Sequence, residues 1–210
     1  MGADDAVLGI DGCPGGWVGA LVTDGQVSWY AGSLASLVAL PAAVVAVDMP
    51  LALPVDGARR ACEVAARARL GAARSSIFFA PPSVVLSAAS HAEASVLARS
   101  VGSVGVSIQT WNIVPKIREA LAADPGRLLE VHPELSFRAL GPVTASKKTA
   151  AGRAERLALL GNPVLPRGVA PVEDLLDALA CATTAARWLD GKATVLGEEL
   201  LDGRLSRIVV

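Results

Sequence analysis

Two apolar runs that each end in an aspartate constrain the fold of this chain more than any other feature. Val7–Ile10 is followed by Asp11, and Ala42–Val47 is followed by Asp48. Short apolar runs bounded by turn residues are typical of strands that are buried on both faces. A carboxylate beside a buried strand is costly unless a partner neutralises its charge. The two aspartates are therefore candidates for a functional site.

The first apolar run opens an expected antiparallel meander. Gly and Pro residues fill positions 12–16 and predict a turn, and Asp24-Gly25 is a strong hairpin signal. These two turns separate three expected strands, over residues 6–12, 17–22 and 26–31.

A helical crossover joins this meander to the next apolar run. Ser33 is a typical N-cap for a short helix that ends before Pro41, and residues 44–47 follow as a buried strand. A strand after such a crossover usually lies parallel to the first strand and beside it. This arrangement places Asp11 and Asp48 at the same carboxyl edge, where open α/β sheets bind their ligands.

The rest of the chain is mainly helical in pattern. We expect helices over residues 57–71, 83–101, 109–123, 148–160 and 172–189. A fifth strand is expected over residues 128–132, and short strand-like pieces lie at 194–196 and 208–210. The pattern predicts an α/β fold in which residues 1–210 form a single domain, with a helical insertion at about 57–123.

Composition limits the classes of function. The chain is 52% hydrophobic with a formal net charge of −1, so it lacks the general basic field of a nonspecific nucleic-acid binder. Basic residues for a nucleic acid would have to be local, as in the arginines of residues 59–74, which are explained equally well as a solvated helix face. The first residues lack a signal-peptide pattern and no apolar run is long enough to span a membrane, so we expect a cytoplasmic protein without membrane contact.

Two further aspartates lie on the expected helix 172–189. Asp174 and Asp177 are spaced i, i+3, so both project from one face. Together with Asp11 and Asp48 they supply four carboxylates, which suits one or two Mg²⁺ or Mn²⁺ ions. The alternatives are that Asp174 complements the helix dipole and that Asp11 and Asp48 are turn residues.

Acidic and imidazole side chains alternate after position 129. Glu130, His132 and Glu134 would share one face of a strand. Glu134 is a candidate metal ligand or general base, and His132 is a candidate proton shuttle or substrate ligand. A hydrogen-bonded edge strand is the alternative.

Several basic or hydroxyl residues are candidates for binding substrate phosphate. Lys116 and the adjacent Lys147 and Lys148 are suited to neutralise its charge, although ordinary surface lysines explain them too. Arg74 and Ser76 are further candidates for substrate contact.

Seven separated motifs, in order between about residues 7 and 190, resemble the domain of unknown function 429 family, which is described as predicted ribonuclease H-like nucleases. The motifs are Ile10–Trp17, Val47–Leu51, Arg60–Glu63, Ser76–Phe78, Pro115–Glu119, Glu130–Glu134 and Asp174–Ala178. The resemblance implies a ribonuclease H-like fold with a mixed five-stranded sheet and flanking helices. In that superfamily the first strand, the fourth strand and a late helix supply the metal-binding acids, and Asp11, Asp48 and the Asp174/Asp177 pair fall on those places. The pattern of residues 174–180 is also similar to that of Holliday-junction resolvases.

The residues and the resemblance together predict a metal-dependent nuclease or phosphodiesterase. Asp11, Asp48, Asp177, Glu134 and Lys116 are its expected catalytic residues, with Asp174 as a further metal ligand. The expected partner is a nucleic acid or a phosphate-containing small molecule, and association into a homodimer stays open. Two alternatives are a small-molecule phosphotransferase of the actin-like or sugar-kinase type and a noncatalytic nucleic-acid-binding module.

Overall fold

The computed structural model describes residues 5–123 and 126–210, which form two compact units. The sheet unit comprises Met1–Met49, Gly126–Thr194 and Val209–Val210, and the helical unit comprises Pro50–Pro125 and Val195–Ile208. Residues 1–4, on which the expected absence of a signal peptide partly rests, lie outside the described residues. The prediction of one domain with an insertion over 57–123 stays a prediction.

A mixed five-stranded sheet forms the centre of the sheet unit. Its strand order is β3-β2-β1-β4-β5, with β1, β2 and β3 antiparallel and with β4 and β5 parallel to β1. The strands are β1 (Val7–Cys13), β2 (Gly16–Thr23), β3 (Gln26–Gly32), β4 (Val44–Val47) and β5 (Leu128–Glu130). The expected meander and the parallel fourth strand are therefore confirmed, and the chain has an α/β fold with helices flanking this sheet.

The first turn is shorter than the sequence predicted. β1 continues through Asp11 to Cys13, which pairs with Gly16, so the turn consists of Pro14 and Gly15 alone. Gly15 has a φ of 83°, a backbone angle that glycine adopts without the steric cost of a side chain. Asp11 consequently lies within a strand and not in a turn, which removes one of the alternatives for its role.

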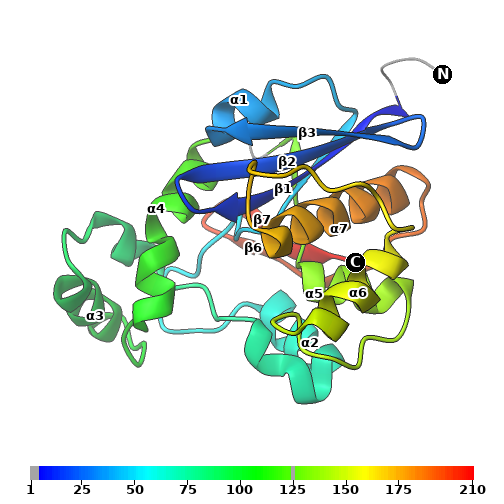
Figure 1. Cartoon of the computed structure of the whole chain (residues 1–210). Coiled ribbons are helices and arrows are strands. Elements are labelled where there is room, and N and C mark those ends of the chain that lie inside the picture. The colour runs from blue at the N-terminus through cyan, green and yellow to red at the C-terminus, as the bar shows by residue number, and fades with distance from the viewer. Residues whose placement is uncertain (1–4, 124–125) are drawn as a thin grey trace. The chain divides into compact units, whose positions relative to one another are not determined.

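Helices cover the two faces of the sheet (Figure 1). α1 (Leu34–Val38) begins after Ser33, whose hydroxyl accepts a hydrogen bond from the Ser36 amide. α7 (Val172–Leu189) crosses the opposite face and has the bounds that the sequence predicted. A Cβ at Gly9 would lie 2.0 Å from the Ala178 carbonyl oxygen, so only glycine permits this close approach of α7 to β1.

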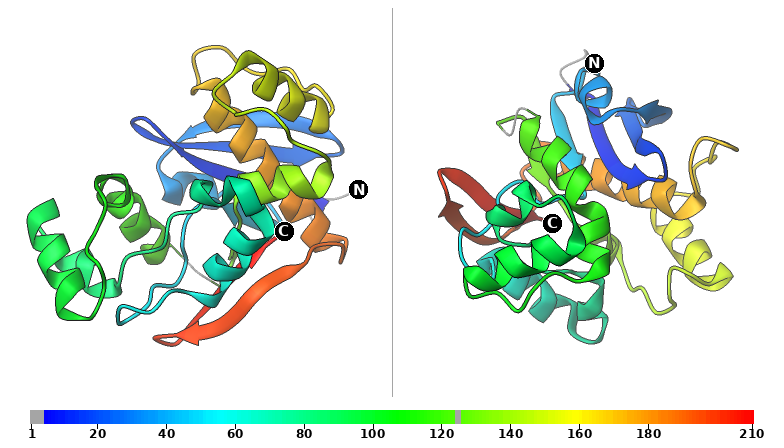
Figure 2. Two further views of the ribbon diagram at one scale, coloured as in Figure 1. Left: turned by 90° about the horizontal axis from the view of Figure 1, so that it is seen from below. Right: turned by 90° about the vertical axis from the view of Figure 1, so that its left-hand side faces the viewer.

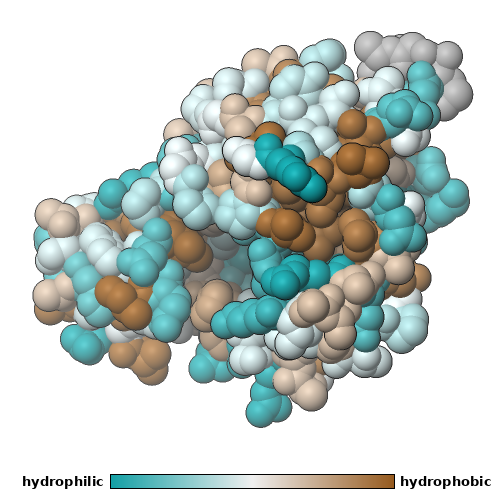
Figure 3. Space-filling model, viewed as in Figure 1, coloured by the Kyte–Doolittle hydropathy of each residue, from teal (hydrophilic) through white to brown (hydrophobic). Residues whose placement is uncertain are grey.

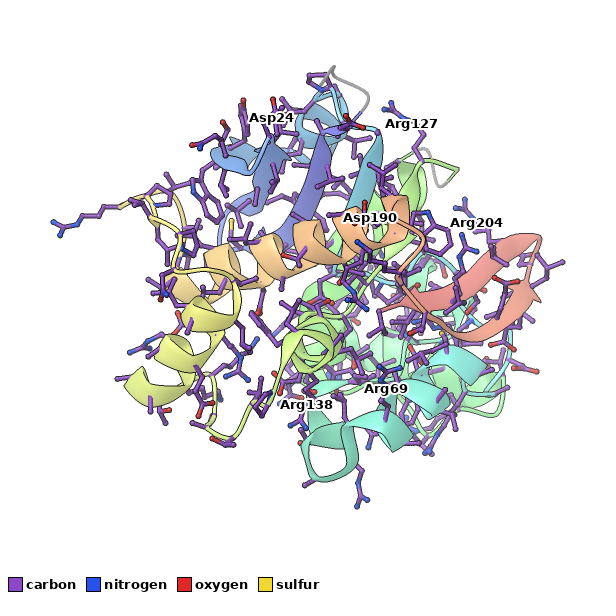
Figure 4. The ribbon with its side chains drawn as sticks, turned by 90° about the vertical axis from the view of Figure 1, so that its right-hand side faces the viewer. Asp24, Arg69, Arg127, Arg138, Asp190 and Arg204 are labelled. Atoms are coloured by element: carbon purple, nitrogen blue, oxygen red, sulfur yellow. The ribbon has the colours of Figure 1, made fainter. Side chains whose placement is uncertain are left out.

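The remaining elements of the sheet unit pack around α7. α5 (Pro133–Leu140) and α6 (Ala150–Leu159) contribute Phe137 and Leu157 to an apolar cluster with Leu176 of α7. Figure 4 shows α7 crossing the strands, with Asp190 just beyond its end and Asp24 at the β2–β3 turn. Figure 3 shows apolar residues gathered over the region of α7 and the chain before it.

The helical unit combines short helices with a hairpin. Its elements are α2 (Ala61–Leu70), η2 (Gly71–Ser76), η3 (Ser83–Ser87), α3 (His91–Ser100), α4 (Ile108–Ala122), β6 (Val195–Leu201) and β7 (Arg204–Val209), of which Val209 belongs to the sheet unit. β6 lies along α2 (Figure 2), where a Cβ at Gly197 would come within 2.3 Å of the Cys62 nitrogen. No helix in the described ranges is long and apolar enough to cross a membrane.

Two predictions for this unit were wrong. Residues 83–101 do not form one helix, because a capping box divides them: Ser90 Oγ accepts from the Glu93 amide and Glu93 Oε2 accepts from the Ala89 amide. The short strands expected in the tail are longer and are joined by an Asp202-Gly203 turn.

Candidate functional site

Four aspartates of the sheet unit act on one another electrostatically, and we call Asp11, Asp48, Asp174 and Asp177 the acid cluster. The parallel ladder between β1 and β4 ends at the pair Ile10 and Val47, and the Asp48 amide donates to the Ile10 carbonyl at 3.1 Å. Asp11 and Asp48 are thus the next residues in register at the carboxyl edge of these strands. Asp174 and Asp177 come from the first two turns of α7.

The acid cluster is costly in its ionised form. Burial raises the pKa of Asp11 well above its usual range, and the charges of Asp48, Asp177 and Asp174 raise it further. Burial also raises the pKa of Asp48 to about 8, with Asp177 and Glu130 adding to this shift. The two groups therefore retain protons at pH values at which an ordinary aspartate is fully ionised.

Lys147 is the cation that faces the acid cluster. Its Nζ lies 2.7 Å from Asp177 Oδ2, and its charge also acts on Asp11 and Asp48. Burial lowers the pKa of Lys147, but the charge and hydrogen bond of Asp177 and the charges of Asp48 and Asp11 together raise it above its ordinary value. From the sequence, Lys147 and Lys148 are both candidates for neutralising substrate phosphate, and Lys148 is an expected substrate-binding residue. Both lysines are exposed in the structure, and it is Lys147 that forms an ion pair with an acid of the cluster.

Two buried residues beside the acid cluster interact with its negative charges. Glu130, at the end of β5, is buried and contributes to the raised pKa of Asp48. Cys181 lies one turn after Asp177 on α7, where burial and then the charges of Asp48, Asp11 and Asp177 raise its pKa well above the usual range. The thiol is therefore kept in its unreactive protonated form.

Glu134 and His132 do not lie on a strand, because the chain enters α5 directly after Val131. His132 is the N-cap residue of α5, and Glu134 lies in the first turn of that helix. Glu134 Oε2 accepts from Arg156 at 2.7 Å, and Arg138 lies 3.4 Å from Glu134 Oε1. The pair with Arg156 gives Glu134 a role in holding α5 to α6, whereas the pair with Arg138 lies within α5.

The remaining candidates belong to the helical unit. Arg74 and Ser76 lie in η2, where the Arg74 carbonyl accepts from Arg67 at 2.8 Å and Ser76 Oγ donates to the Ala73 carbonyl at 2.9 Å. Lys116 lies on α4. Their expected contacts with substrate stay predictions.

The donors of the acid cluster match Mg²⁺ and Mn²⁺ in kind, since both ions prefer hard carboxylate oxygens. Because Asp11 and Asp48 are buried and the aspartates repel one another, a nearby positive charge would stabilise their ionised forms. Across residues 5–123 and 126–210, no three Asp, Glu, His or Cys side chains converge into a ready-made metal site. In the structure it is Lys147 that binds an oxygen of Asp177.

Comparison with family models assigns the chain to a protein family. Residues 9–200 match the model described as "Protein of unknown function (DUF429)", so the chain belongs to this family. The resemblance carried by the seven sequence motifs is thereby confirmed at the level of the family. Comparisons with curated proteins and with solved structures gave no match.

Proposed function

We propose that this protein is a divalent-metal-dependent phosphodiesterase of the ribonuclease H-like type, with a nucleic acid as its substrate class. The observation that carries the proposal is the acid cluster, in which three separate elements bring carboxylates to the carboxyl edge of β1 and β4. The positions of these acids and the mixed sheet agree with what the resemblance to ribonuclease H-like nucleases implies.

In this proposal Asp11, Asp48 and Asp177 hold Mg²⁺ or Mn²⁺, and Asp174 assists. The bound ion supplies an activated water and neutralises negative charge at the phosphate. Asp11 and Asp48 are held by the sheet and Asp177 by α7, so the oxygens are presented from rigid elements. Lys148, which lies in the same loop as Lys147, is exposed and assigned to substrate phosphate.

The test is cleavage of single-stranded and duplex DNA and RNA, each measured with Mn²⁺, with Mg²⁺ and with chelator. We expect Asp11→Asn and Asp177→Asn to lower metal-dependent cleavage by at least about a hundredfold, since even residues that only orient metal ligands are worth 10- to 100-fold. Asp24→Asn is the matched control, because Asp24 is exposed in the β2–β3 turn with a φ of 51° that asparagine tolerates.

Three results would separate this proposal from its rivals. Full activity in both site variants would exclude the assigned mechanism. Stabilisation of the protein by ATP against heat, with no cleavage of any polynucleotide, would favour a phosphotransferase. Polynucleotide binding without Mn²⁺ binding or cleavage would favour a noncatalytic module.

A further inference from the structure

Lys147 is carried by a loop that α6 fixes in place. Glu155, on α6, accepts hydrogen bonds from the Thr144 amide at 3.1 Å and the Ala145 amide at 2.9 Å, both at Oε2. Its other oxygen accepts from the Thr144 hydroxyl at 2.5 Å. One carboxylate thus satisfies three donors of the loop immediately before Lys147, which fixes the backbone there.

A buried arginine holds the same loop from beneath. Arg156 is 2% exposed and donates to the Ala145 carbonyl at 3.1 Å and to Glu134 Oε2 at 2.7 Å. A Cβ at Gly152 would lie 2.0 Å from the Ser146 carbonyl oxygen, so the loop rests directly on the first turn of α6. Glu134 and Arg156 are therefore positioning residues for the loop that carries Lys147.

The loop directs two adjacent lysines differently. Both lysines are exposed, but the Nζ of Lys147, whose side chain is 48% exposed, lies 2.7 Å from Asp177 Oδ2. An exposed lysine loses side-chain entropy when it stays in one rotamer, so its ion pair persists only where the backbone already directs the side chain towards its partner. The fixed loop orients Lys147 in this way.

We propose that Lys147 is a built-in second cation, so that the acid cluster binds one divalent metal ion where a two-metal site would bind two. This inference rests on the proposed function and states how the charges of that site are balanced. Three acids act electrostatically on Lys147, namely Asp177, Asp48 and Asp11. Once a metal ion has displaced the protons of Asp11 and Asp48, one ammonium leaves two of these three negative charges, which a single Mg²⁺ or Mn²⁺ neutralises. Asp174 acts on Asp11 but is not among the acids that act on Lys147, and it lies outside this count. An ammonium facing a metal ion also steadies the negative phosphate oxygens without occupying a second metal position.

The experiment titrates metal-stripped protein with MnCl₂ by calorimetry and counts bound Mn²⁺ by electron paramagnetic resonance. We expect one ion per chain in the natural protein. Lys147→Met removes the charge while keeping much of the side-chain length, and we expect two ions, the first bound at least about tenfold more tightly because a nearby positive charge is gone. Lys147→Arg should restore one ion.

Lys148→Met is the matched control for metal binding, though not for cleavage, since it removes the same charge from the next position of the same loop and should leave one ion bound with unchanged affinity. Circular dichroism of every variant confirms folding. Two ions in the natural protein, or one ion with unchanged affinity in Lys147→Met, would overturn this proposal and leave the proposed function standing. Absence of Mn²⁺ binding together with absence of metal-dependent cleavage would overturn both.

Discussion

The acid cluster of the sheet unit and a buried ion pair of the helical unit solve opposite electrostatic problems. In the helical unit, Glu63 Oε1 accepts from Arg60 at 2.9 Å and 2.8 Å and from the Ala80 amide at 2.8 Å. Arg60 also donates to the Ala52 carbonyl at 3.1 Å. Both residues are almost completely buried, and each charge is matched by its partner.

Asp11, Asp48 and Asp177 of the acid cluster are not matched in this way. These three carboxylates act on the single ammonium of Lys147, and burial and the charge of Asp177 raise the pKa of Asp48 to about 8. A matched buried pair is explained by structure alone, whereas an excess of like charge destabilises the fold and calls for a ligand of opposite charge. The contrast teaches that charge imbalance, more than burial of charge, marks the candidate site.

The largest expected change in stability comes from breaking the matched pair. Glu63→Gln removes the carboxylate charge that contacts the buried Arg60 guanidinium, and we expect a loss of about 3 to 5 kcal/mol in the free energy of unfolding. Urea titration at pH 7 measures it. The double variant Arg60→Met/Glu63→Leu removes both charges and should recover most of the loss. A single variant as stable as the natural protein would show that the pair is not a stabilising element.

In the acid cluster, by contrast, we expect that removing a carboxylate raises the free energy of unfolding. Asp48 has a pKa of about 8 in the folded chain and an ordinary value near 3.8 when unfolded, so the folded state binds the extra proton between these values. The metal-free protein should therefore lose stability as pH rises from 5 to 8, and Asp48→Asn should lose less, because only the contribution from the raised pKa of Asp11 remains. At about 1.4 kcal/mol per pKa unit, we expect the variant to be about 2 to 4 kcal/mol more stable at pH 8, with the gap closing towards pH 5. Parallel pH profiles in chelator would contradict the assigned charge excess.

Local patterns in the sequence were sufficient for the five-stranded sheet and for α1, α6 and α7, but they did not predict α5. The run over 44–47 and the Asp24-Gly25 turn predicted β4 and the β2–β3 hairpin, and Pro171 marked the start of α7. These signals are local, because each depends on side-chain periodicity or on the backbone limits of Gly and Pro. Ser90 and Glu93 carried a capping signal as well, but the apolar spacing across 83–101 led to one long helix.

The choice between Lys147 and Lys148 depended on distant residues. Glu155 and Arg156 lie on the following helix, and Glu134 lies on the preceding one, yet together they decide which lysine faces Asp177. Glu134 itself was misplaced for the same reason, because its partner Arg156 is 22 residues away. Contacts of this range have no local pattern, so the sequence did not separate Lys147 from Lys148.

The smallest expected effect comes from a lysine pair outside both regions. Lys192 Nζ lies 2.8 Å from Asp190 Oδ2, a distance similar to that between Lys147 and Asp177, but these two side chains are 68% and 56% exposed. Water screens such a pair, so Lys192→Met should change the free energy of unfolding by less than about 0.5 kcal/mol in urea titration. The same substitution at Lys147 leaves three acids with one positive charge fewer and should destabilise the metal-free protein measurably more at pH 8. Equal effects at the two lysines would mean that the 2.7 Å contact of Lys147 is an ordinary surface pair. The acid cluster would then not differ from the rest of the surface in its need for positive charge.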